Sequence, residues 1–120
     1  MRSITAIGLF VFSSFALADP VSDSFSALLG SARAAADQGE LCIKELKRTQ
    51  DTKQCRIFSK AHDLYRERLK GMKLSLENSK EGPEAAASKI SDEDWQALKR
   101  EGKKIGLVID YVESYAESHK

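Results

Sequence analysis

Residues 55–76 read CRIFSKAHDLYRERLKGMKLSL and carry the strongest helical signal in the chain. Apolar and aromatic side chains recur in this stretch at alternating intervals of three and four residues, at Cys55, Phe58, His62, Tyr65, Leu69, Met72 and Leu76. This spacing keeps all of them on one face of a helix. An Asp-x-x-Gln capping pattern at 51–54 precedes the stretch, and a Gly-Pro breaker follows it at 82–83. We therefore predict a helix over residues 52–79.

Upstream, residues 21–47 keep a single apolar helical phase from end to end. Its members are Val21, Phe25, Leu28, Ala32, Ala36, Gly39, Cys42, Ile43 and Leu46. A glycine inside a helix costs about 1 kcal/mol relative to alanine, so a helix break at Gln38–Gly39 is one interpretation. Because the phase is not reset across Gly39, we prefer one continuous helix with this glycine on the packed face, where a neighbouring backbone or ring can approach closely.

A third helix is predicted over residues 92–118, after a linker over residues 80–91. Ser91 and Asp94 form the cap of this helix, and the carboxylates of residues 92–94 favour the positive end of its dipole. Ile90 and Trp95 are spaced to form a hydrophobic staple across the cap. The three-four alternation then continues through Trp95, Leu98, Gly102, Ile105, Ile109, Val112 and Ala116.

The two cysteines, Cys42 and Cys55, lie on the apolar faces of the first two helices, on either side of a polar stretch at 48–51. An antiparallel hairpin brings such positions within the distance of about 7 Å between Cα atoms that a disulfide requires. We predict a disulfide between them. A bond between two chains and a pair of free thiols are the alternatives.

The amino terminus has the layout of a secretory signal peptide. Arg2 precedes an apolar run at 4–12, and the small-residue triplet Ala-Leu-Ala follows at 16–18. A membrane anchor is the other interpretation, but the run is shorter than the roughly 20 apolar residues that span a bilayer. We predict cleavage after Ala18, which leaves residues 19–120 as a single helical domain, periplasmic or secreted, with no transmembrane segment.

Together these patterns predict an all-α fold. It is a small up-down-up three-helix bundle with a disulfide-linked helical hairpin, after an N-terminal signal peptide.

No catalytic, nucleotide or metal motif is present, so we predict neither an enzyme nor a cofactor. The carboxylates of Asp92, Glu93 and Asp94 are explained by the helix cap. His62 lies on the apolar face of the second helix, where a partly buried, hydrogen-bonded histidine is the simpler interpretation. The alternative function is a small-ligand or metal carrier whose site lies inside the bundle near His62, with Tyr65 and Trp95 nearby. Met72 is a potential metal ligand, but it lies nearly three helical turns beyond His62 and cannot reach it directly.

Charge distribution is the remaining functional signal. Residues 41–73 contain ten basic and four acidic side chains, a local excess of +6 in a chain whose net charge is +1. A solvated helix face is the simpler interpretation of such an excess, and a surface that binds an anionic partner is the alternative. We expect this partner to be another protein or an anionic envelope component, and not nucleic acid, because aromatic residues do not interleave with the charges. The predicted partner-binding residues are Lys53, Arg56, Lys60, Arg66, Arg68, Lys70 and Lys73. The predicted function is that of an exported, non-catalytic protein-interaction module, such as an inhibitor, immunity, adaptor or small chaperone protein.

Overall fold

The computed structural model describes residues 20–120, and the predicted signal peptide lies outside the described residues. Within residues 20–120 the secondary structure is entirely helical, with α2 at Pro20–Arg48, α3 at Lys53–Glu77, α4 at Pro83–Ala87 and α5 at Asp92–Ser118. The predicted all-α class is therefore confirmed. The long helices begin and end within two residues of the predicted bounds, and the predicted linker contains the short helix α4.

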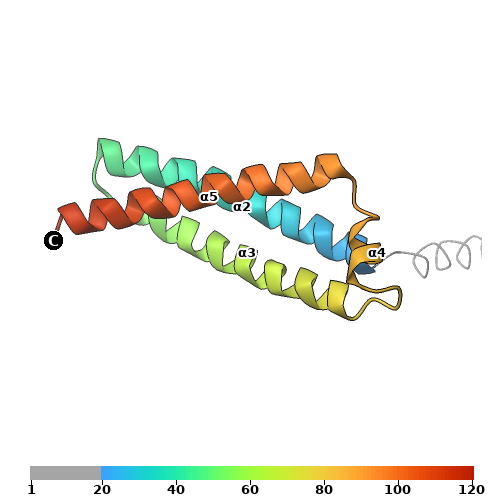
Figure 1. The fold of residues 1–120 in the computed structure, drawn as a ribbon. Helices are drawn as coiled ribbons and strands as arrows, with labels where there is room; N and C mark the ends of the chain where they lie inside the picture. The colour runs from blue at the N-terminus through green and yellow to red at the C-terminus, as the bar shows by residue number, and fades with distance from the viewer. Residues whose placement is uncertain (1–19) are drawn as a thin grey trace, which may run out of the picture.

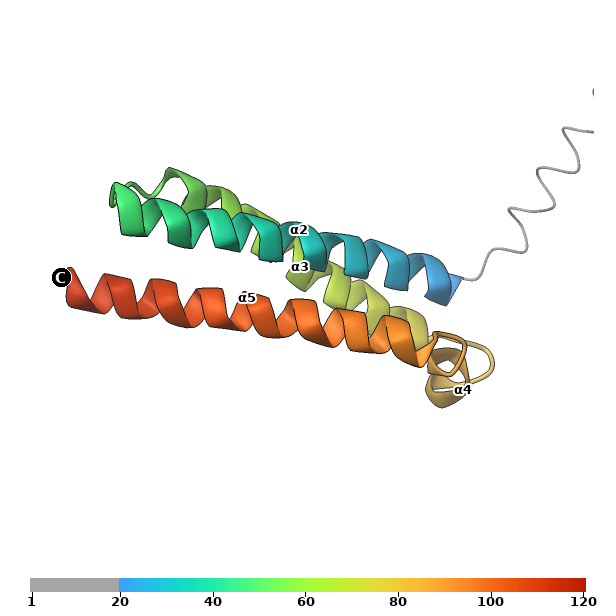
Figure 2. The same cartoon turned by 90° about the horizontal axis from the view of Figure 1, so that it is seen from above.

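Helix α2 lies between the other two long helices, α3 and α5. Figure 1 shows α3 running back antiparallel to α2 and α5 returning in the direction of α2. Figure 2 shows the same arrangement from above, with α4 at the end where α2 begins and α3 ends. The backbone of α2 packs along both α3 and α5, whereas the backbones of α3 and α5 scarcely approach each other. The bundle is thus two helix pairs that share α2.

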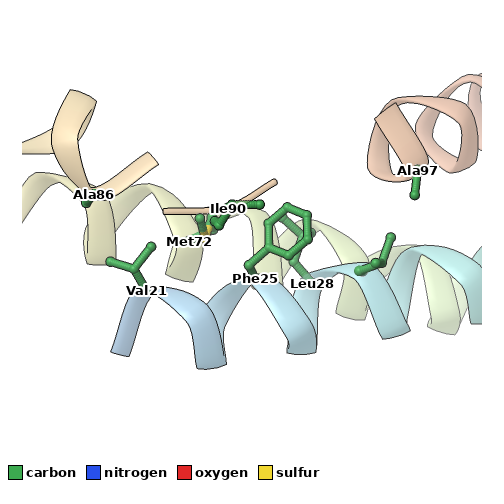
Figure 3. Packing of buried hydrophobic residues seen from close by; sticks show 8 residues of the cluster. Val21, Phe25, Leu28, Met72, Ala86, Ile90 and Ala97 are labelled. Atoms are coloured by element: carbon green, nitrogen blue, oxygen red, sulfur yellow. The ribbon is translucent and has the colours of Figure 1, made fainter. Parts of the chain in front are cut away.

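Two hydrophobic clusters follow one another along α2. We call the one near α4 the proximal cluster, and Figure 3 shows Val21 and Phe25 of α2 pointing toward Met72 of α3 and Ile90. Trp95 packs its ring edge-on against Phe25, with 5.1 Å between ring centroids, and its indole Nε1 donates to the Ala87 carbonyl oxygen over 3.2 Å. These contacts fix α4 and the start of α5 to the bundle.

The distal cluster lies between the middle of α2 and the disulfide. Its buried members are Ala32, Ala35, Ala36, Cys42, Leu46, Phe58, Ile105 and Val108. The alanines contributed by α2 leave room for larger side chains from α3 and α5, so that α2 can pack closely on both sides.

Gly39 lies inside the continuous helix α2, so the predicted glycine on the packed face is confirmed and the alternative helix break is wrong. A Cβ added to Gly39 would lie 2.6 Å from Cγ2 of Val108 and 3.2 Å from Cε1 of Phe58. Both distances are shorter than ordinary van der Waals contact. The missing side chain therefore allows α3 and α5 to approach α2 at the same level.

A disulfide joins Cys42 of α2 to Cys55 of α3, with 4.4 Å between their Cα atoms. The predicted intramolecular bond is confirmed, and no free cysteine exists among the described residues. The predicted capping box at 51–54 is wrong, because Thr52 is the N-cap residue and its side chain makes no capping hydrogen bond. Oδ1 of Asp51 accepts a hydrogen bond from the backbone N–H of Lys53 over 3.1 Å, and the backbone N–H of Gln54 donates to Oε1 of Glu45 over 2.7 Å. A carboxylate from α2 thus stabilises the start of α3.

The predicted cap of α5 is confirmed. Ser91 is the N-cap residue, and its Oγ accepts a hydrogen bond from the backbone N–H of Asp94 over 3.1 Å. Ile90 and Trp95, the predicted staple, both belong to the proximal cluster. Local sequence signals therefore fix the point at which α5 begins.

Candidate partner-binding surface

All seven basic residues predicted to bind a partner lie on α3, and all of them are exposed. The ion pairs found within residues 20–120 join Lys89 to Glu81, Lys104 to Glu101 and Lys120 to Glu117, so none of the seven takes part in one. Arg56 alone makes a side-chain hydrogen bond, from Nη1 to Oγ1 of Thr52 over 2.9 Å. The seven basic side chains on α3 therefore form no ion pairs within the described part of the chain.

The seven basic side chains project from several sides of α3 and do not form one stripe along it. Residues seven apart lie almost above one another on a helix, which pairs Lys53 with Lys60 and, separately, Arg66 with Lys73. Arg68 lies elsewhere and lines a hollow between α3 and α2 together with Lys70 and Glu67. The structure thus divides the predicted basic face into separate groups.

The apolar face predicted for α3 is only partly covered. Phe58 and Met72 are buried, His62, Tyr65 and Leu76 are half-buried, and Leu69 has 40% of its surface exposed. Leu69 is thus a member of the predicted apolar face that the bundle leaves exposed. The physical reason is that α5 packs against α2 and leaves the adjacent side of α3 without a neighbouring helix.

A cleft of about 350 Å³ lies between α3 and α5 at Tyr65, one helical turn before Leu69. It is lined by Tyr65, Trp95, Gln96, Leu98, Lys99 and Gly102, and we call it the α3–α5 cleft. The Tyr65 side chain of α3 approaches α5 closely at Gly102, where an added Cβ would lie 3.2 Å from the Tyr65 hydroxyl oxygen. Figure 1 shows the two helices diverging from one another toward the end that carries α4.

The lining residues from α5 were not among the predicted site residues, although a signal for one of them exists in the sequence. Lys99 follows Trp95 by four residues, a spacing that puts both side chains on one side of a helix. The pattern of α5 alone does not show that this side borders a cleft, because it contains no information about which neighbour lies there.

Tyr65 provides a spectroscopic test of the cleft. Burial raises the pKa of its hydroxyl above the ordinary value of 10.0, because the charged phenolate is less well solvated there. The folded state holds this proton more tightly than the unfolded chain, so stability falls as the pH rises above about 10. In an ultraviolet titration of tyrosinate, the absorbance change of Tyr65 is the part that the Tyr65→Phe variant lacks. The midpoint of this change should lie above pH 10. A midpoint at or below 10 would show that the Tyr65 hydroxyl is fully solvated.

His62 is half-buried between two aromatic rings. Its ring stacks on Phe58 with 5.8 Å between centroids, and its centroid is 6.3 Å from that of Tyr65. Met72, the further ligand of the carrier hypothesis, is buried in the proximal cluster, whereas Phe58 belongs to the distal cluster. Within residues 20–120, no group of three His, Cys, Asp or Glu side chains is placed to hold a metal ion. The structure thus places Met72 apart from His62, whereas Tyr65 lies beside His62 and lines the α3–α5 cleft with Trp95.

His119 ends α5 and interacts only with its own last turn. Its ring stacks on that of Tyr115 at 4.0 Å, and its Nδ1 lies 2.9 Å from the Tyr115 carbonyl oxygen. The two histidines therefore lie in separate local environments.

None of the helices in residues 20–120 is both long and apolar enough to cross a membrane. No protein-family model, curated protein or solved structure matches this chain, so its functional assignment depends on the surface described above.

Proposed function

We propose that this chain is an exported, non-catalytic protein-interaction module that binds an acidic partner protein through the basic residues of α3. Inhibitors, immunity proteins, adaptors and small chaperones work in this way. The observation that carries the proposal is the set of seven exposed bases on one helix, none of which has an ion-pair partner within the described residues. Unpaired surface charges of one sign attract partners of the other sign and accelerate their association.

Two further observations support export and a binding role. The leader pattern at residues 1–18 is that of a secretory signal, and disulfides such as Cys42–Cys55 persist mainly in oxidising compartments outside the cytosol. The same disulfide ties α3 to α2, so the charged side chains project from a helix whose position is fixed. A rigid surface loses less conformational entropy on binding than a flexible one.

The proposal is tested by affinity capture from an envelope extract of the source organism, with the disulfide-linked protein as bait. Reversing Lys60, Arg66 and Lys70 to Glu should reduce recovery of the partner about tenfold or more, because each reversal replaces an attraction by a repulsion. Raising the salt concentration should weaken capture of the partner by the unmodified bait.

The matched control reverses Arg100, Lys103 and Lys104 of α5, which are also exposed, and changes the net charge by the same amount. It should retain the partner. The proposal fails if the unmodified protein captures no acidic protein, if both triple variants lose the partner equally, or if only anionic envelope polymers or lipids are recovered.

A further inference from the structure

We propose that the α3–α5 cleft is the docking site for one amphipathic helix of the acidic partner. In the bound state, the apolar side of that helix covers Tyr65, Leu69, Trp95 and Leu98, and its carboxylates meet Arg66, Lys73 and Lys99. This inference rests on the proposed function and assigns it to one of the several basic groups around α3.

The first argument is the uncovered apolar face. Leu69 lies one helical turn beyond Tyr65 on the same side of α3, and it is 40% exposed where the neighbouring Met72 is only 4% exposed. Across the cleft, Trp95 and Leu98 of α5 are also only partly buried, and both pack against the proximal cluster. Tyr65 of α3 and Trp95 and Leu98 of α5 thus line one hollow, with the exposed Leu69 one turn beyond Tyr65, and an amphipathic helix packs into such an arrangement.

The second argument is charge. Arg66 and Lys73 are three residues before and four residues after Leu69, so they lie beside it on the surface of α3. Lys99 lines the opposite wall of the cleft. All three are exposed and none has an ion-pair partner within residues 20–120. Lys99 at the α5 side of the cleft, with Arg66 and Lys73 beside Leu69 on α3, is complementary to a helix whose apolar stripe is flanked by Asp or Glu.

Two exposed carboxylates of α3 lie near these bases, Asp63 three residues before Arg66 and Glu77 four residues after Lys73, but neither lines the cleft and neither forms an ion pair within residues 20–120. Glu67 lines the hollow on the other side of α3, against α2. Glu101 of α5 lies 3.8 Å from the ammonium nitrogen of Lys104, with which it pairs. Among residues 20–120, Lys99 is therefore the one charged residue that lines the α3–α5 cleft.

A second copy of this chain is a poorer occupant than an acidic helix. In a symmetric dimer the same surface meets itself, so the basic residues Arg66, Lys73 and Lys99 of one copy would face the basic residues of the other. Repulsion between like charges at an interface costs several kcal/mol, which argues for a partner of different sequence.

The test uses two synthetic helical peptides of about three heptads, with identical leucine stripes flanked by Glu in one and by Lys in the other. Trp95 is the only tryptophan of the chain and lines the cleft, so its fluorescence reports occupation directly. The Glu peptide should change the fluorescence saturably, with a Kd about tenfold or more below that of the Lys peptide. Leu69→Asp should abolish this binding, whereas Leu107→Asp, at an exposed position of α5 that does not line the cleft, should leave it unchanged.

Two charge-reversal pairs locate the site. Arg66→Glu with Lys73→Glu should weaken binding of the Glu peptide at least about tenfold, and Lys53→Glu with Lys60→Glu less than about threefold. Each pair lies on α3, spans seven residues and changes the net charge equally. Circular dichroism confirms that each variant remains helical.

The inference is overturned if the Glu peptide leaves Trp95 fluorescence unchanged, if both charge pairs weaken binding equally, or if anionic lipid vesicles alone produce the change. Failure of the inference can be separated from failure of the proposed function by affinity capture. A captured partner that is lost with the Lys53/Lys60 pair and kept with the Arg66/Lys73 pair would disprove the cleft and preserve the proposed function. A partner unaffected by either pair and by the joint reversal of Lys60, Arg66 and Lys70 would contradict both.

Discussion

Replacing Cys42 and Cys55 together by alanine is expected to lower the free energy of unfolding by about 3 kcal/mol. The disulfide closes a loop of 13 residues, and its removal restores that much conformational freedom to the unfolded chain. Domains of this size have total stabilities of about 5–15 kcal/mol, so the loss is a large part of the whole. The melting temperature should fall by about 10–25 °C.

Differential scanning calorimetry and urea denaturation followed by circular dichroism measure this effect. The control is the unmodified protein under reducing conditions, in which both cysteine side chains remain and only the bond between them is broken. It separates the effect of the disulfide from the effect of removing the fully buried sulfur atom of Cys42. It should lose a similar amount of stability. Equal melting temperatures for the oxidised and reduced proteins would show that the helical hairpin does not depend on the disulfide.

Replacing Gly39 by leucine should destabilise the protein by about 3 kcal/mol, although leucine is the better helix former. The Cβ alone would lie 2.6 Å from Cγ2 of Val108, and the remaining atoms of the leucine have to displace α5 or α3 from α2. Val108 is buried and β-branched, so its side chain has little freedom to turn away. Gly39→Ala should show a smaller loss of the same sign.

The matched control is Gly30→Leu in the same helix. Gly30 is exposed, and an added Cβ there would meet nothing within 4 Å. Because only helix propensity acts at this position, Gly30→Leu should raise the free energy of unfolding by about 0.5–1 kcal/mol. Urea denaturation distinguishes the two positions by the sign of the change. A stabilised Gly39→Leu protein would mean that α2 does not pack as closely as described.

The features that the sequence predicted correctly are those encoded within one helix. The unbroken apolar phase of residues 21–47 predicted that α2 continues through Gly39, because a helix break would have reset it. The Ser91 cap was predictable because donor and acceptor are three residues apart. The Cys42–Cys55 bond followed from two apolar faces and the turn between them.

The features that could not be predicted depend on contacts between helices. The α3 cap comes from Glu45, nine residues earlier and on another helix, so the Asp-x-x-Gln pattern at 51–54 was misleading. The exposure of Leu69 could not be predicted either, because periodicity identifies the apolar side of a helix but not whether a neighbouring helix covers it. For the candidate site, the sequence indicated exposed bases, whereas their distribution around α3 and the cleft required the structure.

The position of α2 between α3 and α5 has an evolutionary consequence. Ala32, Ala35 and Ala36 are at most 3% exposed, so replacement of any of them by a larger residue disturbs packing on α2. Exposed charges on α3 are under no such constraint, since substitutions at such positions usually change stability by less than about 0.5 kcal/mol. Related proteins could therefore acquire new binding specificities by mutating α3 while inheriting the central helix almost unaltered.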